Sequence, residues 1–204
     1  GEQQTIDHFW NWFAWITQNL DRSETAWLLQ GIEGTGKGLL FHRIMAPILG
    51  NWNTTAKRME ELTEQFTGFM ENKFLVFMDE VEKTTNSQQQ IIAAKLRNLI
   101  TEPEVSIRKM YAPPYMARNY ANLVFASNSI DQIYISTTDR RFNVAPYQTE
   151  KLQISQDEVE RIDDELDDLF AFLWHYNVSR EQARTALHNE AKDKLIELNL
   201  TGPD

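Results

Sequence analysis

The chain has 204 residues, of which 42% are hydrophobic and 25% charged, so it is long enough for one sizeable core and short for two. It contains 30 acidic and 20 basic residues and therefore carries a formal net charge of −10 at pH 7. The absence of cysteine excludes disulfides, thiolate nucleophiles and zinc–thiolate clusters. No apolar run approaches the ~20 residues of a membrane-spanning helix, so we expect no membrane partner. We expect a globular domain excised from a larger protein.

The first 24 residues predict an aromatic-rich helix. Apolar side chains recur at helical spacing between residues 5 and 20, at Ile6, Phe9, Trp10, Phe13, Ile16 and Leu20, with Trp12 and Trp15 beside that face. A partner surface is one interpretation. Packing on the domain core is favoured, because aromatic side chains supply the largest burial per residue. We therefore assign residues 1–24 to a helix that packs on a core formed by residues 25–148.

The most informative stretch follows a short apolar run at residues 26–29. Residues 31–38 read Gly-Ile-Glu-Gly-Thr-Gly-Lys-Gly and lead into a helical pattern. Strand, glycine-rich loop and helix in this order are typical of phosphate binding, because the glycines let successive N–H groups point at one concavity. The helix N-terminus adds partial positive charge, and Lys37 adds a full one. The predicted nucleotide-binding residues are Gly31, Gly34, Thr35, Gly36, Lys37, Gly38 and Leu39.

Gly38 departs from the phosphate-loop pattern, which has Ser or Thr at this position as a Mg²⁺ ligand. Mg²⁺ keeps several of its waters in proteins, so it would rely here on Asp79, the phosphates and water. Thr35 is an alternative source of the hydroxyl, although its position in the loop differs. We expect nucleotide binding to be retained and hydrolysis to be slow.

Two further apolar runs end in polar side chains. Residues 74–78 lead into Asp79 and Glu80, and residues 123–127 lead into Asn128. Such runs predict strands buried in a parallel sheet, whose carboxyl ends hold the ligands of open α/β folds. We predict that Asp79 and Glu80 form the Mg²⁺ site, that Glu80 also polarises the attacking water, and that Asn128 senses the γ-phosphate. Ordinary strands followed by solvated turns are the alternative interpretation.

Residues 105–122 are the best local concentration of basic and aromatic side chains. A strand-like alternation runs to Lys109, and the Pro113-Pro114 break predicts a hairpin. The acidic chain has no acid between Glu104 and Asp131. This combination suits single-stranded nucleic acid, although taken alone a hairpin whose tyrosines merely pack is equally compatible. The predicted DNA-contacting residues are Arg108, Lys109, Tyr111, Tyr115 and Arg118.

Arg140 and Arg141 precede a short apolar strand near residue 142. The pair is compatible with a salt-bridge site or with an arginine finger that reaches into a neighbouring subunit's nucleotide. Residues 149–204 predict a helical segment. A capping box at residues 155–158 opens one helix to residue 173, and a second box at residues 179–182 opens another to residue 198.

Taken in chain order, these motifs resemble superfamily 3 helicases, the AAA+-type ring motors of viruses, phages and plasmids. The matching residues are Gly31 to Gly38, Met78-Asp79-Glu80, Ser127-Asn128 and Asp139-Arg140-Arg141-Phe142. They are most similar to the helicase part of phage and plasmid primase-helicases, including the C-terminal helicase region of a deep-sea vent phage primase-polymerase. The resemblance implies an α/β P-loop NTPase (AAA+-like) core with a central, mainly parallel sheet flanked by helices, and N- and C-terminal helical segments.

The resemblance also implies a function. It describes an ATP- and Mg²⁺-dependent helicase that forms a ring, with a hexamer expected, and grips single-stranded or forked DNA through a pore hairpin carrying Lys109. Arg140 or Arg141 would act in trans, and a covalently linked primase-polymerase domain and the bacterial host cytoplasm are implied. The alternative is a nucleotide-binding ring scaffold that assembles an attached primase without unwinding. A small P-loop kinase fits less well, because it would need neither hairpin nor trans arginines.

Overall fold

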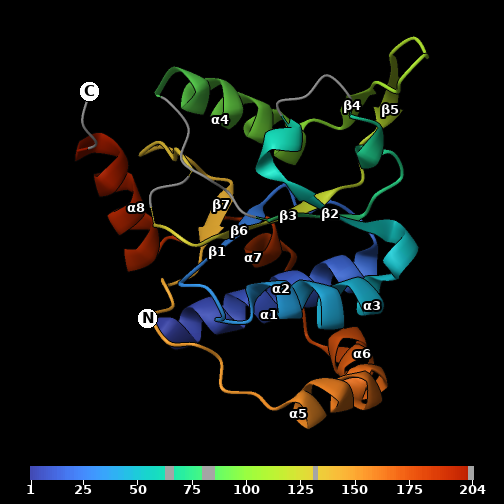
Figure 1. The fold of residues 1–204 in the computed structure, drawn as a ribbon, viewed down its shortest axis with the longest axis vertical. Helices are drawn as coiled ribbons and strands as arrows, with labels where there is room; N and C mark the ends of the chain where they lie inside the picture. The colour runs from blue at the N-terminus through green and yellow to red at the C-terminus, as the bar shows by residue number, and fades with distance from the viewer. Residues whose placement is uncertain (63–66, 80–85, 131–132, 202–204) are drawn as a thin grey trace.

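The apolar runs that predict buried strands form one parallel sheet in a computed structural model, which describes residues 1–62, 67–79, 86–130 and 133–201 (Figure 1). The order across the sheet is β2-β3-β6-β1-β7, and every neighbouring pair is parallel. The strands are β1 (Ala26–Gln30), β2 (Thr54–Arg58), β3 (Leu75–Asp79), β6 (Asn122–Ser127) and β7 (Phe142–Val144). A separate antiparallel pair consists of β4 (Glu104–Ile107) and β5 (Tyr115–Arg118). The predicted α/β class with a parallel sheet is confirmed.

Helices surround this sheet. The α-helices are α1 (Glu2–Asn19), α2 (Lys37–Leu39), α3 (Ala46–Leu49), α4 (Asn86–Thr101), α5 (Gln156–Arg161), α6 (Leu166–His175), α7 (Arg180–Ala183) and α8 (Glu190–Thr201). A π-helix, η1 (Leu40–Met45), joins α2 to α3, so the chain is helical without a break from residue 37 to residue 49. The 3₁₀ helices are η2 (Asn51–Asn53), η3 (Met59–Leu62), η4 (Gly68–Met70) and η5 (Asp163–Glu165). None of the described helices is long and apolar enough to cross a bilayer.

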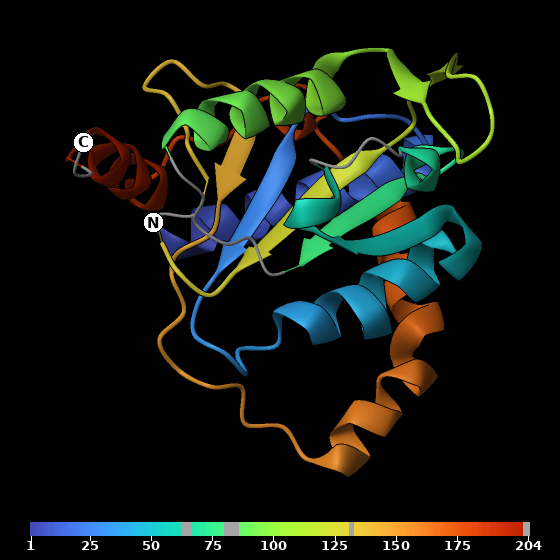
Figure 2. The same cartoon turned by 45° about the horizontal axis from the view of Figure 1, so that its top comes forward.

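The strands are buried on both faces, which explains their continuous apolar sequences. Trp27 and Phe77 belong to a cluster with α1 and the helical residues 37–49, whereas Leu28 and Val76 belong to a cluster with α4 and α8. Figure 2 shows α4 above the sheet and the helical segment 37–49 below it. Because β1, β3 and β6 pair in parallel, their carboxyl ends lie at one edge of the sheet.

The N-terminal helix packs on the core as predicted, but through a rotated face. Trp12, Phe13 and Ile16 are fully buried, whereas Ile6 and Leu20 of the predicted stripe are 43% and 66% exposed. Polar residues take part in the buried face because they have partners. Asn11, for example, donates to the carbonyl of Ser179 at 2.9 Å and accepts from its amide at 2.7 Å.

Two features of the fold differ from the prediction. Strand β2 was not predicted, because Thr54–Arg58 is rich in threonine and cations rather than apolar side chains. The predicted helix from residue 179 to residue 198 is divided into α7 and α8. Its break has a tertiary cause, since Asn143 accepts a hydrogen bond from the Leu187 amide at 2.7 Å and Asn189 donates to Val144 at 2.9 Å. Both contacts tie the intervening chain to β7.

Candidate nucleotide and nucleic-acid sites

The predicted phosphate loop connects β1 to α2, and its glycines are required by close contacts. A Cβ at Gly31 would lie 2.6 Å from the Cβ of Gln148. Gly36 has a φ of +89°, and a Cβ there would lie 2.9 Å from Cδ2 of Leu152. A left-handed backbone at this point costs any L side chain energy. The loop conformation therefore depends on glycine at these two positions.

A strap formed by residues 145–152 follows the loop on one side. Its backbone makes four hydrogen bonds with the strand and loop. They run from the Ala145 amide to Leu28 at 2.9 Å, the Gln148 amide to Gln30 at 3.0 Å, the Ile32 amide to Gln148 at 2.9 Å, and the Leu152 amide to Gly34 at 2.9 Å. The Lys151 side chain passes alongside Gly34. The sequence analysis missed this strap, because its contacts are between main-chain atoms and its residues match no motif.

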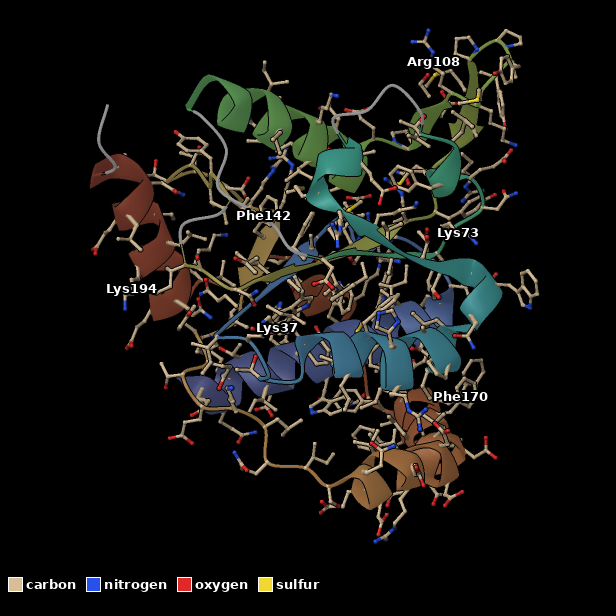
Figure 3. All side chains as sticks on the ribbon, in the orientation of Figure 1. Lys37, Lys73, Arg108, Phe142, Phe170 and Lys194 are labelled. Atoms are coloured by element: carbon tan, nitrogen blue, oxygen red, sulfur yellow. The ribbon has the colours of Figure 1, made fainter. Side chains whose placement is uncertain are left out.

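Lys37 lies at the start of α2, directly over the loop (Figure 3). Its ammonium donates to the carbonyls of Gly31 at 2.7 Å and Ile32 at 3.0 Å, and to the Thr35 hydroxyl at 3.2 Å. Burial lowers the pKa of Lys37, and the negative charges of Asp79 and Glu33 act in the opposite direction. Within the described chain, the amides of residues 33–36 have no backbone acceptor. A lysine and unsatisfied amides around one concave loop form a site for an anion such as phosphate.

The strand-end residues lie at the same edge of the sheet. Asp79 ends β3, which is separated from β1 by β6 alone. Burial lowers the pKa of Lys37, and the negative charge of Asp79 opposes that lowering. Asn128 follows β6, is exposed, and accepts a hydrogen bond on its main-chain oxygen from the Tyr147 hydroxyl at 2.8 Å. Glu80, the predicted catalytic carboxylate and second Mg²⁺ ligand, lies outside the described residues.

The chemistry of this edge fits a hydrated Mg²⁺. Among the described residues, no group of three or more acidic or histidine side chains could hold a metal ion. At this edge Asp79 could supply one carboxylate, with nucleotide phosphates and water completing the shell. Around Gly38 a Cβ would meet no atom within 4 Å. The missing hydroxyl of the loop pattern is therefore not explained by lack of space.

The two candidate arginines have different surroundings. The Asp139 carboxylate accepts hydrogen bonds from the amides of Arg141 at 2.8 Å and Phe142 at 3.1 Å, and it lies 3.8 Å from the Arg141 guanidinium. The buried Lys192 ammonium donates to the Asp139 carbonyl at 2.9 Å. Arg141 is therefore held by contacts within the chain, whereas Arg140 is exposed.

The predicted hairpin is confirmed, with Glu104 opposite Arg118 and Ile107 opposite Tyr115. Tyr111 near its tip is 100% exposed. The Arg108 main chain, just after β4, is held by Thr67. The Thr67 amide donates to the Arg108 carbonyl at 3.1 Å, and the Thr67 hydroxyl accepts from the Arg108 amide at 3.0 Å. In Figure 3 Lys37 lies near the middle of the molecule and Arg108 at its upper right, so the hairpin and the phosphate loop are separate regions.

A side chain that the sequence analysis missed organises the hairpin. Glu71, just after η4, forms an ion pair with Lys109 and accepts a hydrogen bond from the Tyr115 hydroxyl. The bond from Lys109 is the largest cause that lowers the pKa of Glu71, and the same bond raises the pKa of Lys109. Arg118 is not part of this cluster and lies over the ring of Tyr120, 5.1 Å from its centroid. No local sequence pattern around Glu71 predicts that it contacts the hairpin, because its partners are distant in sequence.

Comparison with known proteins gives a match to a family model and relatives from a phage. A family model described as "Family of unknown function (DUF5906)" matches residues 29–165. The DNA primase-polymerase of Nitratiruptor phage NrS-1 is 29% identical over 143 residues, which cover 70% of this chain and 20% of that protein. An apo structure of the NrS-1 C-terminal region has a TM-score of 0.87 and 24% identity, over 97% of this chain and 48% of that one.

A second apo structure of the same NrS-1 region, its A form, has a TM-score of 0.80 and 25% identity over 95% of this chain and 46% of that one. The expected relationship to a phage primase-polymerase and to the C-terminal region of that protein is confirmed. The chain spans about half the length of these solved relatives and 20% of the NrS-1 primase-polymerase.

Proposed function

We propose that this chain, which belongs to the DUF5906 family of unknown function, is the ATP-dependent DNA helicase or translocase domain of a phage replication protein. In this proposal it acts as an oligomeric ring in the bacterial host cytoplasm. The observation that carries the proposal is the phosphate loop itself. Lys37 lies over that loop, and the negative charge of Asp79, at the end of β3, interacts with the Lys37 ammonium. This pairing of a cation for phosphate with a carboxylate for metal is the basic apparatus of P-loop hydrolysis.

In this proposal each residue of the edge has one task. The loop amides and Lys37 bind the β- and γ-phosphates, and Asp79 holds Mg²⁺, which neutralises phosphate charge when bound. Glu80 polarises the attacking water, and the exposed amide of Asn128 contacts the γ-phosphate. The Tyr147 bond to the Asn128 main chain fixes the position from which that amide acts.

The proposed ring follows from the arginine pair. Arg141 is held by Asp139 within its own subunit, whereas Arg140 is exposed and able to enter a neighbour's site. We therefore assign the trans arginine to Arg140. An arginine supplied in this way stabilises charge that develops on the transferring phosphate, so turnover would depend on assembly.

The proposed DNA contact is the hairpin. Lys109 and Arg108 supply cations for phosphates, while Tyr111 and Tyr115 supply rings for bases. The name of the NrS-1 relative, a DNA primase-polymerase, supports a role in phage DNA replication and a linked primase-polymerase domain. Glycine at position 38 favours a second candidate, a ring scaffold with little or no unwinding, because the usual Mg²⁺-binding hydroxyl is absent there.

The experiment is an ATP binding and hydrolysis assay on the Lys37→Ala variant, with Lys194→Ala as the matched control. Lys194 is an exposed lysine of α8 outside the phosphate loop. We expect Lys37→Ala to lose hydrolysis and Lys194→Ala to retain it. Equal turnover in both variants would contradict the proposal. Nucleotide binding without hydrolysis or unwinding by the unaltered protein would support the scaffold instead.

A further inference from the structure

Trp52 stands out among the tryptophans. Its indole is 91% exposed, whereas the side chains of Trp12, Trp15 and Trp27 are buried. It occupies the middle of η2, immediately before the edge strand β2. Leaving a whole indole in water forgoes a large burial energy, so a fully displayed tryptophan is a feature that the fold does not need for its core.

The turn that displays Trp52 is rigid. Gly50 has a φ of +86° and accepts a hydrogen bond from the Asn53 amide at 2.9 Å. The Asn53 carbonyl in turn accepts from the Phe74 amide at 2.6 Å, which anchors the turn to the start of β3. An aromatic ring on such a fixed turn loses little conformational freedom when a planar group stacks on it.

A cation belongs to the same turn. The Lys73 ammonium donates to the Trp52 carbonyl at 2.6 Å. An ammonium has three N–H donors, so two remain for other acceptors. The sequence around the turn has few acids for a chain of this charge. Residues 34–59 and residues 105–130 contain neither Asp nor Glu, and the nearby Glu71 is paired with Lys109. Phosphate would meet little repulsion here.

The turn lies on the same side of the molecule as the hairpin. Lys73 and Arg108 are both on the right of Figure 3, and Figure 2 also shows residues 51–53 and the hairpin on the right. The chain links the two, because Glu71, which binds Lys109 and Tyr115, is only two residues from Lys73. One side of the molecule therefore carries the hairpin, Lys73 and the turn of residues 51–53.

We propose that Trp52 and Lys73 form a second contact for single-stranded nucleic acid, in which a base stacks on the indole and a neighbouring phosphate binds the ammonium. The inference rests on the proposed function and extends its DNA surface from the hairpin to the start of β2. Single-stranded nucleic acid fits because one ring and one adjacent cation match one nucleotide.

The test measures binding of a fluorescein-labelled oligothymidylate and of an abasic strand of the same length, as a function of salt. Trp52→Ala should weaken binding to the oligothymidylate at least about fivefold and leave binding to the abasic strand unchanged, because the abasic strand has no base to stack. Lys73→Gln should weaken binding to both strands and reduce the salt slope by about one. Trp52→Phe keeps an aromatic ring at this position and should therefore retain most of the affinity of the unaltered protein for the oligothymidylate.

The matched control is Trp174→Ala, which removes another exposed tryptophan, from helix α6. It should bind both strands as the unaltered protein does. If Trp52→Ala also binds both strands unchanged while Lys109→Gln weakens them, the inference is wrong and the proposed function stands. Unchanged DNA binding together with an altered oligomeric size would assign the indole to a protein interface and also overturn it. If Lys109→Gln and Arg108→Gln have no effect either, the proposed DNA contact itself fails.

Discussion

The phosphate loop and the hairpin are built in opposite ways. The loop is set by its backbone: glycines make close contacts with the strap at residues 145–152, and main-chain hydrogen bonds fix its path. The hairpin ends in exposed side chains and is tied down through a charged contact, between Glu71 and Lys109. Substitutions should therefore act at the loop through shape and at the hairpin through charge and stacking.

The largest expected effect concerns Arg140, which belongs to neither region. This effect would show that the nucleotide site needs an arginine from a second subunit. Arg140→Ala should reduce ATP turnover by about 10³-fold, because transition-state charge loses its partner in trans. Its thermal unfolding should be unchanged, since Arg140 is exposed. Arg141→Ala should instead lower stability, because Arg141 contacts Asp139 within the fold. The opposite assignment of the two effects would contradict the choice of Arg140.

The next prediction tests whether the loop conformation depends on close packing between its glycines and the strap. Gly31→Ala should lower the free energy of unfolding by about 1–3 kcal/mol, because its Cβ would clash with the Gln148 main chain and Cβ. Gly38→Ala is the control and should raise stability by about 0.5–1 kcal/mol, because this helical position has open space. Urea unfolding curves of the two variants measure the difference. Equal curves would mean that the strap does not restrain the loop.

A smaller effect tests the rule of charge at the hairpin. Glu71→Gln should strengthen binding of single-stranded DNA a few-fold, because Lys109 loses a competing carboxylate. Glu61→Gln, which removes the partner of Lys57 instead, is the matched control and should leave DNA binding unchanged. Weaker binding by Glu71→Gln would show that Glu71 positions the hairpin rather than competing with DNA.

The same contact has a definite pH dependence. The pKa of Glu71 is lowered from 4.5, so the ion pair is complete above that value and is lost only as the pH falls through the lower pKa of the folded state. DNA binding near neutral pH should therefore not change through this group. A titration of DNA affinity between about pH 6 and 8 in wild type and Glu71→Gln should give parallel curves.

The smallest effect concerns the departure from the phosphate-loop pattern. Gly38→Ser should fold normally, because the position has no neighbour within 4 Å of a Cβ. A hydroxyl there can bind Mg²⁺, so we expect a few-fold rise in turnover and a lower Mg²⁺ requirement. Unchanged turnover and Mg²⁺ dependence would show that this chain manages its metal without that hydroxyl.

The strands of the sheet could be predicted from the sequence wherever a strand is buried on both faces. The runs that lead into Asp79 and Asn128 are apolar, and the loop at residues 31–38 has a local pattern. These signals predicted β1, β3 and β6 and the order along the chain of the candidate site residues that follow them. The hairpin was predicted because alternation and a proline pair are also local signals.

The remainder depends on contacts between residues far apart in sequence. Strand β2 lies at the edge of the sheet and lacks an apolar run, and the break between α7 and α8 is made by Asn143 on β7. Glu71 acquires its role only when the fold brings it to Lys109. No periodicity encodes such pairings, so they required the structure.

The most direct test measures ATP turnover of the unaltered protein with and without single-stranded DNA, alongside Lys109→Gln. Because the loop and the hairpin are separate regions of the molecule, a motor must couple them. We expect DNA to raise turnover in the unaltered protein and Lys109→Gln to lose that stimulation while keeping its basal rate. Turnover that does not respond to DNA, in an oligomer that binds it, would contradict the account.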